Sequence, residues 1–210
     1  MSHGDEGNAM PIFDKKSRIE GLNAFGQPRT PPGQFATEKF PVLTYGETPA
    51  ISLDEWRFRA WGELNAEMEW NWKEFLALPQ TTIRADFHCV TTWSRFDDDW
   101  TGVLFKDLVA RLDLKPTARF VMQHAYGGYT TNFPLDLLVN EDAILAHTLN
   151  GEPLPAKHGG PLRMFTPRRY VWKGAKWING VEFMAKDRPG FWEQNGYNTF
   201  ADPWKEERFG

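Results

Sequence analysis

The apolar segments of this chain are short, aromatic and separated by proline, which limits the folds open to it. The 210 residues include ten tryptophans, sixteen phenylalanines and fifteen prolines. Bulky aromatic side chains favour strands, and proline ends regular elements after a few residues. The composition therefore favours sheets and loops over a helical bundle. We find no repeat and no second zone of composition, so one domain is expected.

Apolar periodicity locates the expected elements. A period of two predicts a strand at residues 56–62, and further strands are expected at 81–90, 118–124, 143–148, 162–166 and 177–184. Helical spacing after a turn at Thr101–Gly102 predicts a helix over residues 104–112, and a second, shorter helix is expected over 135–139. The pair Asn150–Gly151 predicts a hairpin turn leading into Pro153–Leu154. These elements indicate an α+β fold of mixed β-sheets with short flanking helices.

The two ends of the chain differ from its centre. Residues 1–36 are rich in glycine, proline, lysine and arginine and show little periodicity, so we expect an extended N-terminal arm whose first ten residues lack structure. The domain is expected over residues 37–210. The tail from Arg188 onward is aromatic but has no clear period.

Charge and hydropathy exclude two classes of partner. The formal net charge is −4 and the pI about 5.8, which is unlike a nucleic-acid-binding domain. No stretch approaches the roughly 20 apolar residues of a membrane span. The start of the chain lacks the basic and then apolar order of a signal peptide. A cytoplasmic protein is therefore expected.

Cys89 is the only cysteine of the chain, so it has no internal disulfide partner. Three roles are open to this cysteine: it could pack as a buried apolar residue, act as a nucleophile, or bind a metal or cofactor supplied from outside. Its neighbour His88 is a poor base because adjacent side chains on a strand point apart; His124 and His158 are the other candidates. A zinc site is disfavoured, since three ligands would be missing. A soft metal that brings most of its own ligands needs only one thiolate.

A basic cluster follows in two runs, His158–Gly159–Gly160–Pro161–Leu162–Arg163 and Lys173–Gly174–Ala175–Lys176–Trp177. The simplest interpretation is a solvated basic edge. Aromatic residues interleave with these charges, however, so part of the charge is expected to converge on a partly buried site. Guanidinium, ammonium and free backbone N–H groups are what a phosphate or another polyanion requires. The cluster therefore predicts a ligand that carries phosphate.

Ordered motifs resemble the sulfite oxidase family of molybdopterin oxidoreductases. The matching segments, in chain order, are Cys89–Val90–Thr91–Thr92–Trp93–Ser94, Trp100–Thr101–Gly102–Val103, Asn150–Gly151–Glu152–Pro153–Leu154–Pro155, His158–Gly159–Gly160–Pro161–Leu162–Arg163 and Lys176–Trp177. Each motif alone is weak, but their order and spacing match from about Phe40 to the C-terminus. The resemblance implies a sulfite oxidase-type molybdopterin-binding domain.

The resemblance also implies roles for particular residues. Cys89 would give its thiolate to molybdenum, in the cofactor molybdenum-molybdopterin. The residues expected to hold the pterin and its phosphate are His158, Arg163, Lys176 and the backbone of Gly174 and Ala175. His124 and Phe40 occupy positions near other cofactor contacts of the family.

Tyr197 is the further catalytic residue that the resemblance implies. It follows Trp192 by five residues and Lys176 by 21, the offsets at which sulfite oxidases place their active-site tyrosine. The alternative is an aromatic residue that packs in the tail with Phe191, Trp192 and Trp204, because tyrosine often buries its ring and leaves only its hydroxyl polar.

The implied reaction transfers an oxygen atom to or from a small substrate such as sulfite, a sulfoxide or an N-oxide. In this family the metal receives two sulfurs from the pterin and one from cysteine, which explains why a single cysteine suffices. Electrons would enter or leave one at a time. Since the chain has no room for a haem domain, a separate redox partner protein, haem or other, is expected. The alternative is a non-catalytic cofactor carrier or interaction module on the same fold.

Two departures from sulfite oxidases concern the substrate. Those enzymes place an Arg-Asn-His run before the Pro-Val element, where this chain reads Thr37–Glu38–Lys39–Phe40–Pro41–Val42, and an arginine at the position of Ser94. Arg95 and Lys39 are the nearby cations that remain. The Cys-Val-x-x-Trp-Ser form instead resembles the bacterial branch that includes methionine-sulfoxide reductases.

Overall fold

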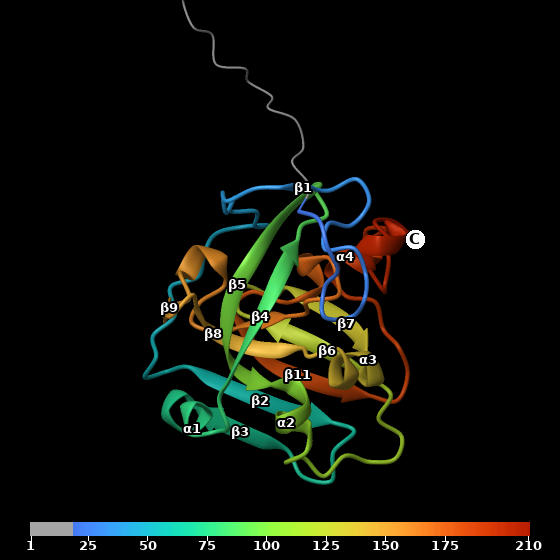
Figure 1. Cartoon of the computed structure of the whole chain (residues 1–210). Helices are drawn as coiled ribbons and strands as arrows, with labels where there is room; N and C mark the ends of the chain where they lie inside the picture. Colours follow the sequence, from blue (N-terminus) through green and yellow to red (C-terminus); the bar gives the residue numbers. More distant parts are fainter. Residues whose placement is uncertain (1–18) are drawn as a thin grey trace, which may run out of the picture.

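Two β-sheets with short helices at their edges make up the fold (Figure 1). The structure is a computed structural model that describes residues 19–210. It confirms the α+β fold of mixed sheets with short flanking helices. The expectation for the first ten residues, and the part of the predicted arm before residue 19, lie outside the described residues. The predicted localisation stays a prediction.

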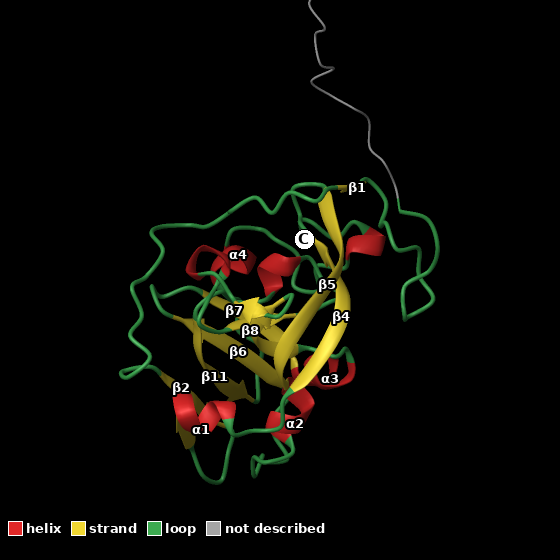
Figure 2. Cartoon of the chain, turned by 60° about the vertical axis from the view of Figure 1, so that its left-hand side comes forward, coloured by secondary structure: helices red, strands yellow, loops and turns green. Residues whose placement is uncertain are grey.

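The first sheet has six strands in the order β1-β5-β8-β10, with β4 beside β5 and β9 beside β8. Its strands are β1 (Phe35–Ala36), β4 (Thr81–His88), β5 (Trp93–Leu104), β8 (Ile144–Leu149), β9 (Glu152–Pro153) and β10 (Arg163–Phe165). β1 runs parallel to β5, and the other pairs are antiparallel. β4 and β5 form a long hairpin that stands to one side of the second sheet (Figure 2). The predicted hairpin at Asn150–Gly151 is confirmed by the pairing of β8 with β9.

The second sheet has five strands in the order β3-β2-β11-β6-β7. They are β2 (Arg57–Gly62), β3 (Met68–Asn71), β6 (Phe120–Ala125), β7 (Thr130–Pro134) and β11 (Ile178–Met184). β2 and β11 are parallel, and the other pairs are antiparallel. The alternation that predicted β2 is confirmed, since Trp56, Phe58 and Ala60 are all buried.

Short helices join the strands. The α-helices are α1 (Trp72–Leu76), α2 (Phe105–Val109), α3 (Leu135–Asn140) and α4 (Phe191–Gln194), and the 3-10 helices are η1 (Ala156–His158), η2 (Val171–Lys173) and η3 (Pro203–Lys205). Helix α1 begins at a capping box in which Asn71 and Glu74 satisfy each other's backbone N–H groups. Among residues 19–210, no helix is long and apolar enough to cross a membrane.

The buried apolar side chains form two clusters. The larger one lies between the sheets and includes Phe58, Val103, Leu145 and Val181. The smaller one lies along the β4–β5 hairpin, and its members are Phe87, Cys89, Trp93, Trp100, Leu104, Ile144, Ala146, Leu154, Phe165 and Val171. Cys89 thus lies at the edge of an apolar cluster, as the packing interpretation also requires.

The predicted turn at Thr101–Gly102 is wrong, because both residues lie inside β5. A side chain at Gly102 would place a β-carbon 2.0 Å from the Leu145 carbonyl oxygen, at a bulge in the β5–β8 pairing. Glycine here permits the close approach of two strands rather than a turn. The helix that follows begins at Phe105 and ends at Val109, shorter than the predicted 104–112.

Two further differences concern strands. The strand predicted over 81–90 ends at His88, so Cys89 lies in the turn that follows. β7 was not predicted because Thr131 and Asn132 are buried polar residues and give no apolar alternation.

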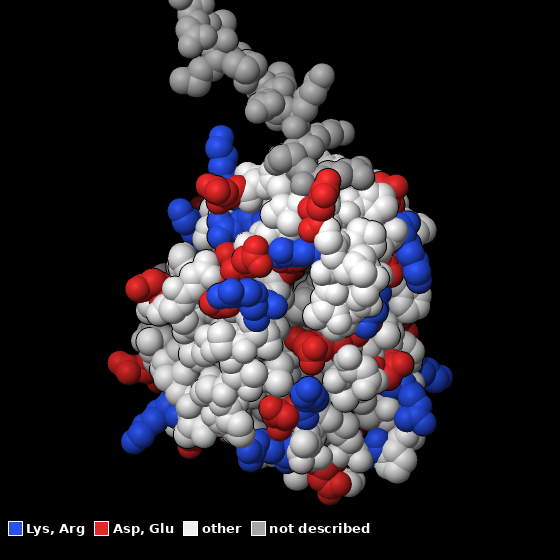
Figure 3. Space-filling model, viewed as in Figure 1, with Lys and Arg blue, Asp and Glu red and all other residues white. Residues whose placement is uncertain are grey.

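On the face seen in Figure 3, lysine and arginine intermingle with aspartate and glutamate, so this face is not strongly basic.

Candidate functional site

Cys89 lies in the tight turn that joins β4 to β5. The Cys89 N–H donates to the Trp93 carbonyl (2.9 Å), and the Thr92 N–H donates to the Cys89 carbonyl (3.1 Å). Thr92 adopts a φ of 77° to close this turn. The buried amide of Gln34, from the arm, also donates to the Cys89 carbonyl (3.1 Å). The backbone of the thiol-bearing residue is therefore held from both sides.

The Cys89 side chain is only 5% exposed, and its Sγ lies 3.1 Å from the Thr91 hydroxyl. Burial raises the pKa of the Cys89 thiol, while the Thr91 hydrogen bonds and the positive charges of Lys176 and Arg208 oppose the rise. Without a bound cation the thiol is therefore protonated at neutral pH. A soft metal would displace that proton, since the thiolate is the ligand form.

His158, Arg163 and Lys176 come together from three parts of the chain, and Lys176 lies within electrostatic reach of Cys89. His158 ends η1, Arg163 begins β10, and Lys176 precedes β11. Gly159, with a φ of +112°, lies between them; a β-carbon there would come within 3.1 Å of both Arg163 and Lys176. Glycine therefore lets the backbone turn pass close to both cations.

Arg163 is a buried guanidinium that has no carboxylate partner among residues 19–210. Only 1% of the residue is exposed, and burial lowers its pKa to about 10, so it stays charged at neutral pH. Its hydrogen bonds all go to backbone carbonyls, those of His158 (3.0 Å), Met164 (3.3 Å) and Val171 (3.5 Å). A buried charge is normally paired, so Arg163 lacks the anion that such a group requires.

Lys176 repeats this imbalance, whereas His158 is neutral. Among residues 19–210, the Lys176 Nζ donates only to carbonyls, those of Leu43 (2.9 Å) and Lys157 (3.1 Å). Burial and then Arg163 lower the pKa of Lys176 to about 7, and burial and then Lys176 lower the pKa of His158 to about 4. Among residues 19–210, no carboxylate pairs with Arg163 or Lys176. The cluster thus fits a bound polyanion such as a phosphate-bearing cofactor.

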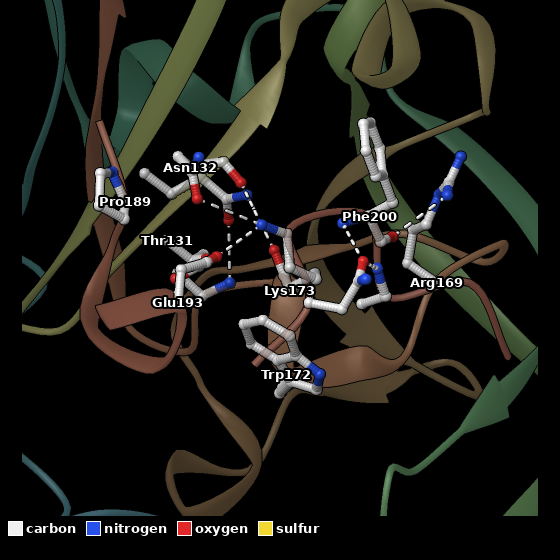
Figure 4. A network of polar contacts seen from close by, with 12 residues as sticks. Thr131, Asn132, Arg169, Trp172, Lys173, Pro189, Glu193 and Phe200 are labelled. Atoms are coloured by element: carbon white, nitrogen blue, oxygen red, sulfur yellow. Dashed lines mark hydrogen bonds and ion pairs between the residues drawn. The ribbon is translucent and has the colours of Figure 1, made fainter. Parts of the chain in front are cut away.

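The second basic run contributes less to this cluster than its composition suggests. The Ala175 N–H donates to the Gln123 side chain (2.9 Å), and the Gly174 N–H donates to the Val171 carbonyl (3.2 Å). Both N–H groups are thus engaged within the protein. Lys173 points instead to Glu193, with Nζ and Oε1 2.5 Å apart (Figure 4).

Phe40 reaches the cluster, and His124 does not. The Phe40 ring stacks on His158 with centroids 3.8 Å apart and planes 6° from parallel. His124 lies on the second sheet, where its Nε2 is 3.0 Å from Glu182 and its ring is 4.8 Å from Trp61. Within the described chain, no hydrogen bond or ring contact joins His124 to Cys89 or to the basic cluster.

Tyr197 packs in an aromatic cluster of the tail. Its ring centroid lies 5.1 Å from that of Trp192, 5.3 Å from Trp172 and 5.1 Å from Phe209. Trp204, expected beside it, is not among its ring contacts. In the part of the chain described, the Tyr197 hydroxyl makes no hydrogen bond to the basic cluster.

Arg208 is a site residue that the sequence did not indicate. It lies in the C-terminal tail, where its guanidinium hydrogen-bonds the carbonyl of Val90, next to Cys89. It also lies 5.0 Å above the Tyr170 ring. Nothing in the polar run Lys205–Glu206–Glu207–Arg208 distinguishes this arginine from a solvated surface charge, so no sequence signal identified it.

Comparisons with known proteins identify the family to which the chain belongs. The family described as "Oxidoreductase molybdopterin binding domain" matches residues 45–192. The uncharacterized oxidoreductase YuiH of Bacillus subtilis (strain 168) is 42% identical over 182 residues, which are 86% of this chain and 92% of that protein.

More distant relatives share parts of the chain. The putative protein-methionine-sulfoxide reductase subunit YedZ1 of Azospira oryzae is 27% identical over 81% of this chain and 66% of its own length. The sulfane dehydrogenase SoxCD of Paracoccus pantotrophus shares the fold, with a TM-score of 0.62 at 19% identity over 71% of this chain and 42% of that one. The chain thus belongs to the sulfite oxidase-like family of oxidoreductases with a molybdopterin-binding domain, whose cofactor is molybdenum-molybdopterin.

Proposed function

We propose that this protein is a molybdenum-molybdopterin oxidoreductase that transfers an oxygen atom to or from a small substrate, with Cys89 as the thiolate ligand of molybdenum. One observation carries the proposal. A single buried thiol lies within electrostatic reach of Lys176, which neighbours the buried guanidinium of Arg163, and neither cation has a carboxylate partner among residues 19–210. A soft donor next to unpaired positive charge fits a soft metal held by an anionic cofactor.

The residues of the cluster would have distinct tasks. Arg163 and Lys176 would neutralise the phosphate and orient the pterin, and neutral His158, stacked on Phe40, would provide a ring nitrogen and a flat surface beside it. Protein groups of this kind position a cofactor and tune its field. When bound, the cofactor would supply two further sulfur ligands and a metal that changes oxidation state.

Electrons would be exchanged with a separate redox protein, haem or other. The name of YedZ1 describes that relative as a subunit, which supports a partner protein for this chain as well. The same name describes a putative reductase of methionine sulfoxide. A sulfoxide is therefore tested first, beside sulfite and an N-oxide.

Turnover tests the proposal. Protein produced in a molybdopterin-competent host would be assayed with reduced dye plus dimethyl sulfoxide or trimethylamine N-oxide, and with oxidised dye plus sulfite. We expect turnover with at least one substrate and its loss in Cys89→Ser, because serine lacks the soft donor. Thr82→Ser, an exposed change on the same hairpin, is the matched control. Metal-loaded protein that turns over none of the three would favour the non-catalytic carrier.

A further inference from the structure

The arm that precedes the sheets supplies a buried side chain to the Cys89 turn. Strand β1 of the arm lies parallel to β5, and the Phe35 N–H donates to the Thr92 carbonyl (3.0 Å). Gln34, the residue before β1, is 1% exposed, and its Nε2 donates to the Cys89 carbonyl (3.1 Å) across 55 positions of sequence. Packing of the arm, rather than the hairpin alone, therefore holds this turn.

The Gln34 amide ends a hydrogen-bonded chain of buried polar side chains. His88 Nδ1 lies 2.8 Å from the Ser94 hydroxyl, and that hydroxyl donates to Gln34 Oε1 (3.3 Å). Each of these three residues is at most 1% exposed. Because a hydroxyl has one proton to donate, the Ser94 oxygen accepts from His88, and Nδ1 carries the proton. Each group thus donates to the next, and the chain ends at the Cys89 carbonyl.

This chain fixes the orientation of the Gln34 amide. A flipped amide would place Oε1 against the Cys89 carbonyl oxygen, and that contact would be repulsive. The side chain also faces Tyr170: burial raises the pKa of Tyr170, while Arg208 and then a hydrogen bond with Gln34 oppose the rise. The amide is thus held by several partners and keeps its N–H directed at the Cys89 carbonyl.

The backbone of the turn needs such support. Thr92 closes the turn with a φ of 77°, which is unfavourable for a β-branched residue and persists only where surrounding contacts hold it. The Cys89 carbonyl accepts from both the Thr92 N–H (3.1 Å) and the Gln34 amide. Loss of the Gln34 hydrogen bond would therefore let the turn open and the Cys89 Sγ move.

We propose that Gln34 is a positioning residue for the Cys89 thiol: it holds the β4–β5 turn closed, so that Sγ is in place before a metal binds. The inference rests on the proposed function of Cys89 and adds to that site a residue of the arm, which lies outside the family match at residues 45–192. A ligand held by its surroundings binds a metal more tightly than a mobile one, because it loses less conformational freedom on binding.

Alkylation of the metal-free, full-length protein tests how closed the turn is. Cys89 is 5% exposed, so iodoacetamide reaches it when the turn opens. Gln34→Met keeps the length of the side chain but removes its hydrogen bonds, and it should raise the alkylation rate about fivefold at constant pH. Mass spectrometry would follow the modification.

Gln123→Met is the matched control for alkylation. Gln123 is also fully buried, and it also binds two backbone groups, the Lys173 carbonyl (2.9 Å) and the Ala175 N–H (2.9 Å). Its loss should leave the alkylation rate of Cys89 near that of the wild type. An equal increase in Gln123→Met and Gln34→Met, or no increase in Gln34→Met, would overturn the proposal.

The Cys89 carbonyl gives a spectroscopic signature of the same contact. Because Cys89 is the only cysteine, protein labelled with carbonyl-13C cysteine gives one labelled resonance. It should move upfield in Gln34→Met, since a lost hydrogen bond shields the carbonyl carbon, and stay in place in Gln123→Met. A resonance that moves in neither variant would contradict the role of Gln34. If Gln34→Met does not fold, Ser94→Ala decides: faster alkylation supports the chain of hydrogen bonds, and the wild-type rate overturns it.

Retention of the metal separates this inference from the proposed function. Molybdenum should be lost from the loaded protein on dialysis about tenfold faster in Gln34→Met than in the wild type. Loss that is unchanged in Gln34→Met but faster in Cys89→Ser would overturn the positioning role alone. Loss that is unchanged in both variants would overturn ligation by Cys89, on which the inference rests.

Discussion

Arg163 has two conflicting effects, one on stability and one on binding. Burial of an unpaired guanidinium destabilises the metal-free protein, and the same charge would stabilise a bound phosphate. We expect Arg163→Met to change the free energy of unfolding of the metal-free protein by less than about 1 kcal/mol, because relief of the charge offsets the lost carbonyl hydrogen bonds. Cofactor occupancy at limiting cofactor should fall about tenfold, for a charge-assisted contact of about 1.5–3 kcal/mol.

Chemical denaturation and molybdenum analysis would check both parts for Arg163. Arg84→Met is the control, since Arg84 is an exposed arginine that pairs with Asp99, and it should alter neither quantity substantially. A loss above about 3 kcal/mol in Arg163→Met with normal occupancy would make Arg163 a structural residue instead.

Motif order located some site residues and missed others. His158, Arg163 and Lys176 were grouped from the sequence because they lie in two basic runs interleaved with glycine and aromatic residues. Phe40 and His124 were placed by the resemblance alone, and the structure brings Phe40 to the cluster but shows His124 on the other sheet, beside Glu182. Local spacing does not encode which sheet an isolated histidine faces.

At the scale of elements, a buried polar network joins η2, β7 and α4 (Figure 4). Lys173 is completely buried and pairs with Glu193 at 2.5 Å, hydrogen-bonds the Asn132 carbonyl, and shares Glu193 with the Thr131 hydroxyl (2.6 Å). Polar contacts of this kind come from residues far apart in sequence. They explain why β7 gave no apolar pattern and why Lys173, grouped with the basic run, does not belong to the site.

Lys173→Met should lower the free energy of unfolding by about 3–5 kcal/mol at pH 7, because Glu193 is left buried without its partner. Burial lowers the pKa of Lys173 from 10.5 to about 8, with Glu193 opposing. The folded protein therefore binds fewer protons than the unfolded chain between these values, so the contribution of Lys173 to stability increases from pH 8 to pH 10.5.

Denaturant titrations of wild type and Lys173→Met across this pH range would measure both effects. The double variant Lys173→Met with Glu193→Leu should recover part of the loss, since it removes the orphaned carboxylate as well. A single variant that lost less than about 1 kcal/mol would show that the pair contributes little to stability.

For the whole molecule, the α+β class and the strands β2, β4, β6, β8, β10 and β11 could be predicted from the sequence, whereas β3, β5, β7 and the completed site could not. The family match spans residues 45–192, whereas Gln34, Phe40 and Arg208 lie outside it. The arm and the tail nevertheless meet at the β4–β5 turn, where Gln34 binds the Cys89 carbonyl and Arg208 binds that of Val90. Contacts between opposite ends of a chain depend on tertiary packing, which one sequence does not reveal.

The sulfur count around molybdenum tests the central proposal, ligation by Cys89, most directly. Molybdenum K-edge X-ray absorption of the loaded protein would count sulfur ligands, with Thr82→Ser as control. We expect three sulfurs in the wild type and in the control, two from the cofactor and one from Cys89, and two in Cys89→Ser. Two sulfurs in the wild type, or an unchanged count in Cys89→Ser, would contradict the assignment of Cys89 as the metal ligand.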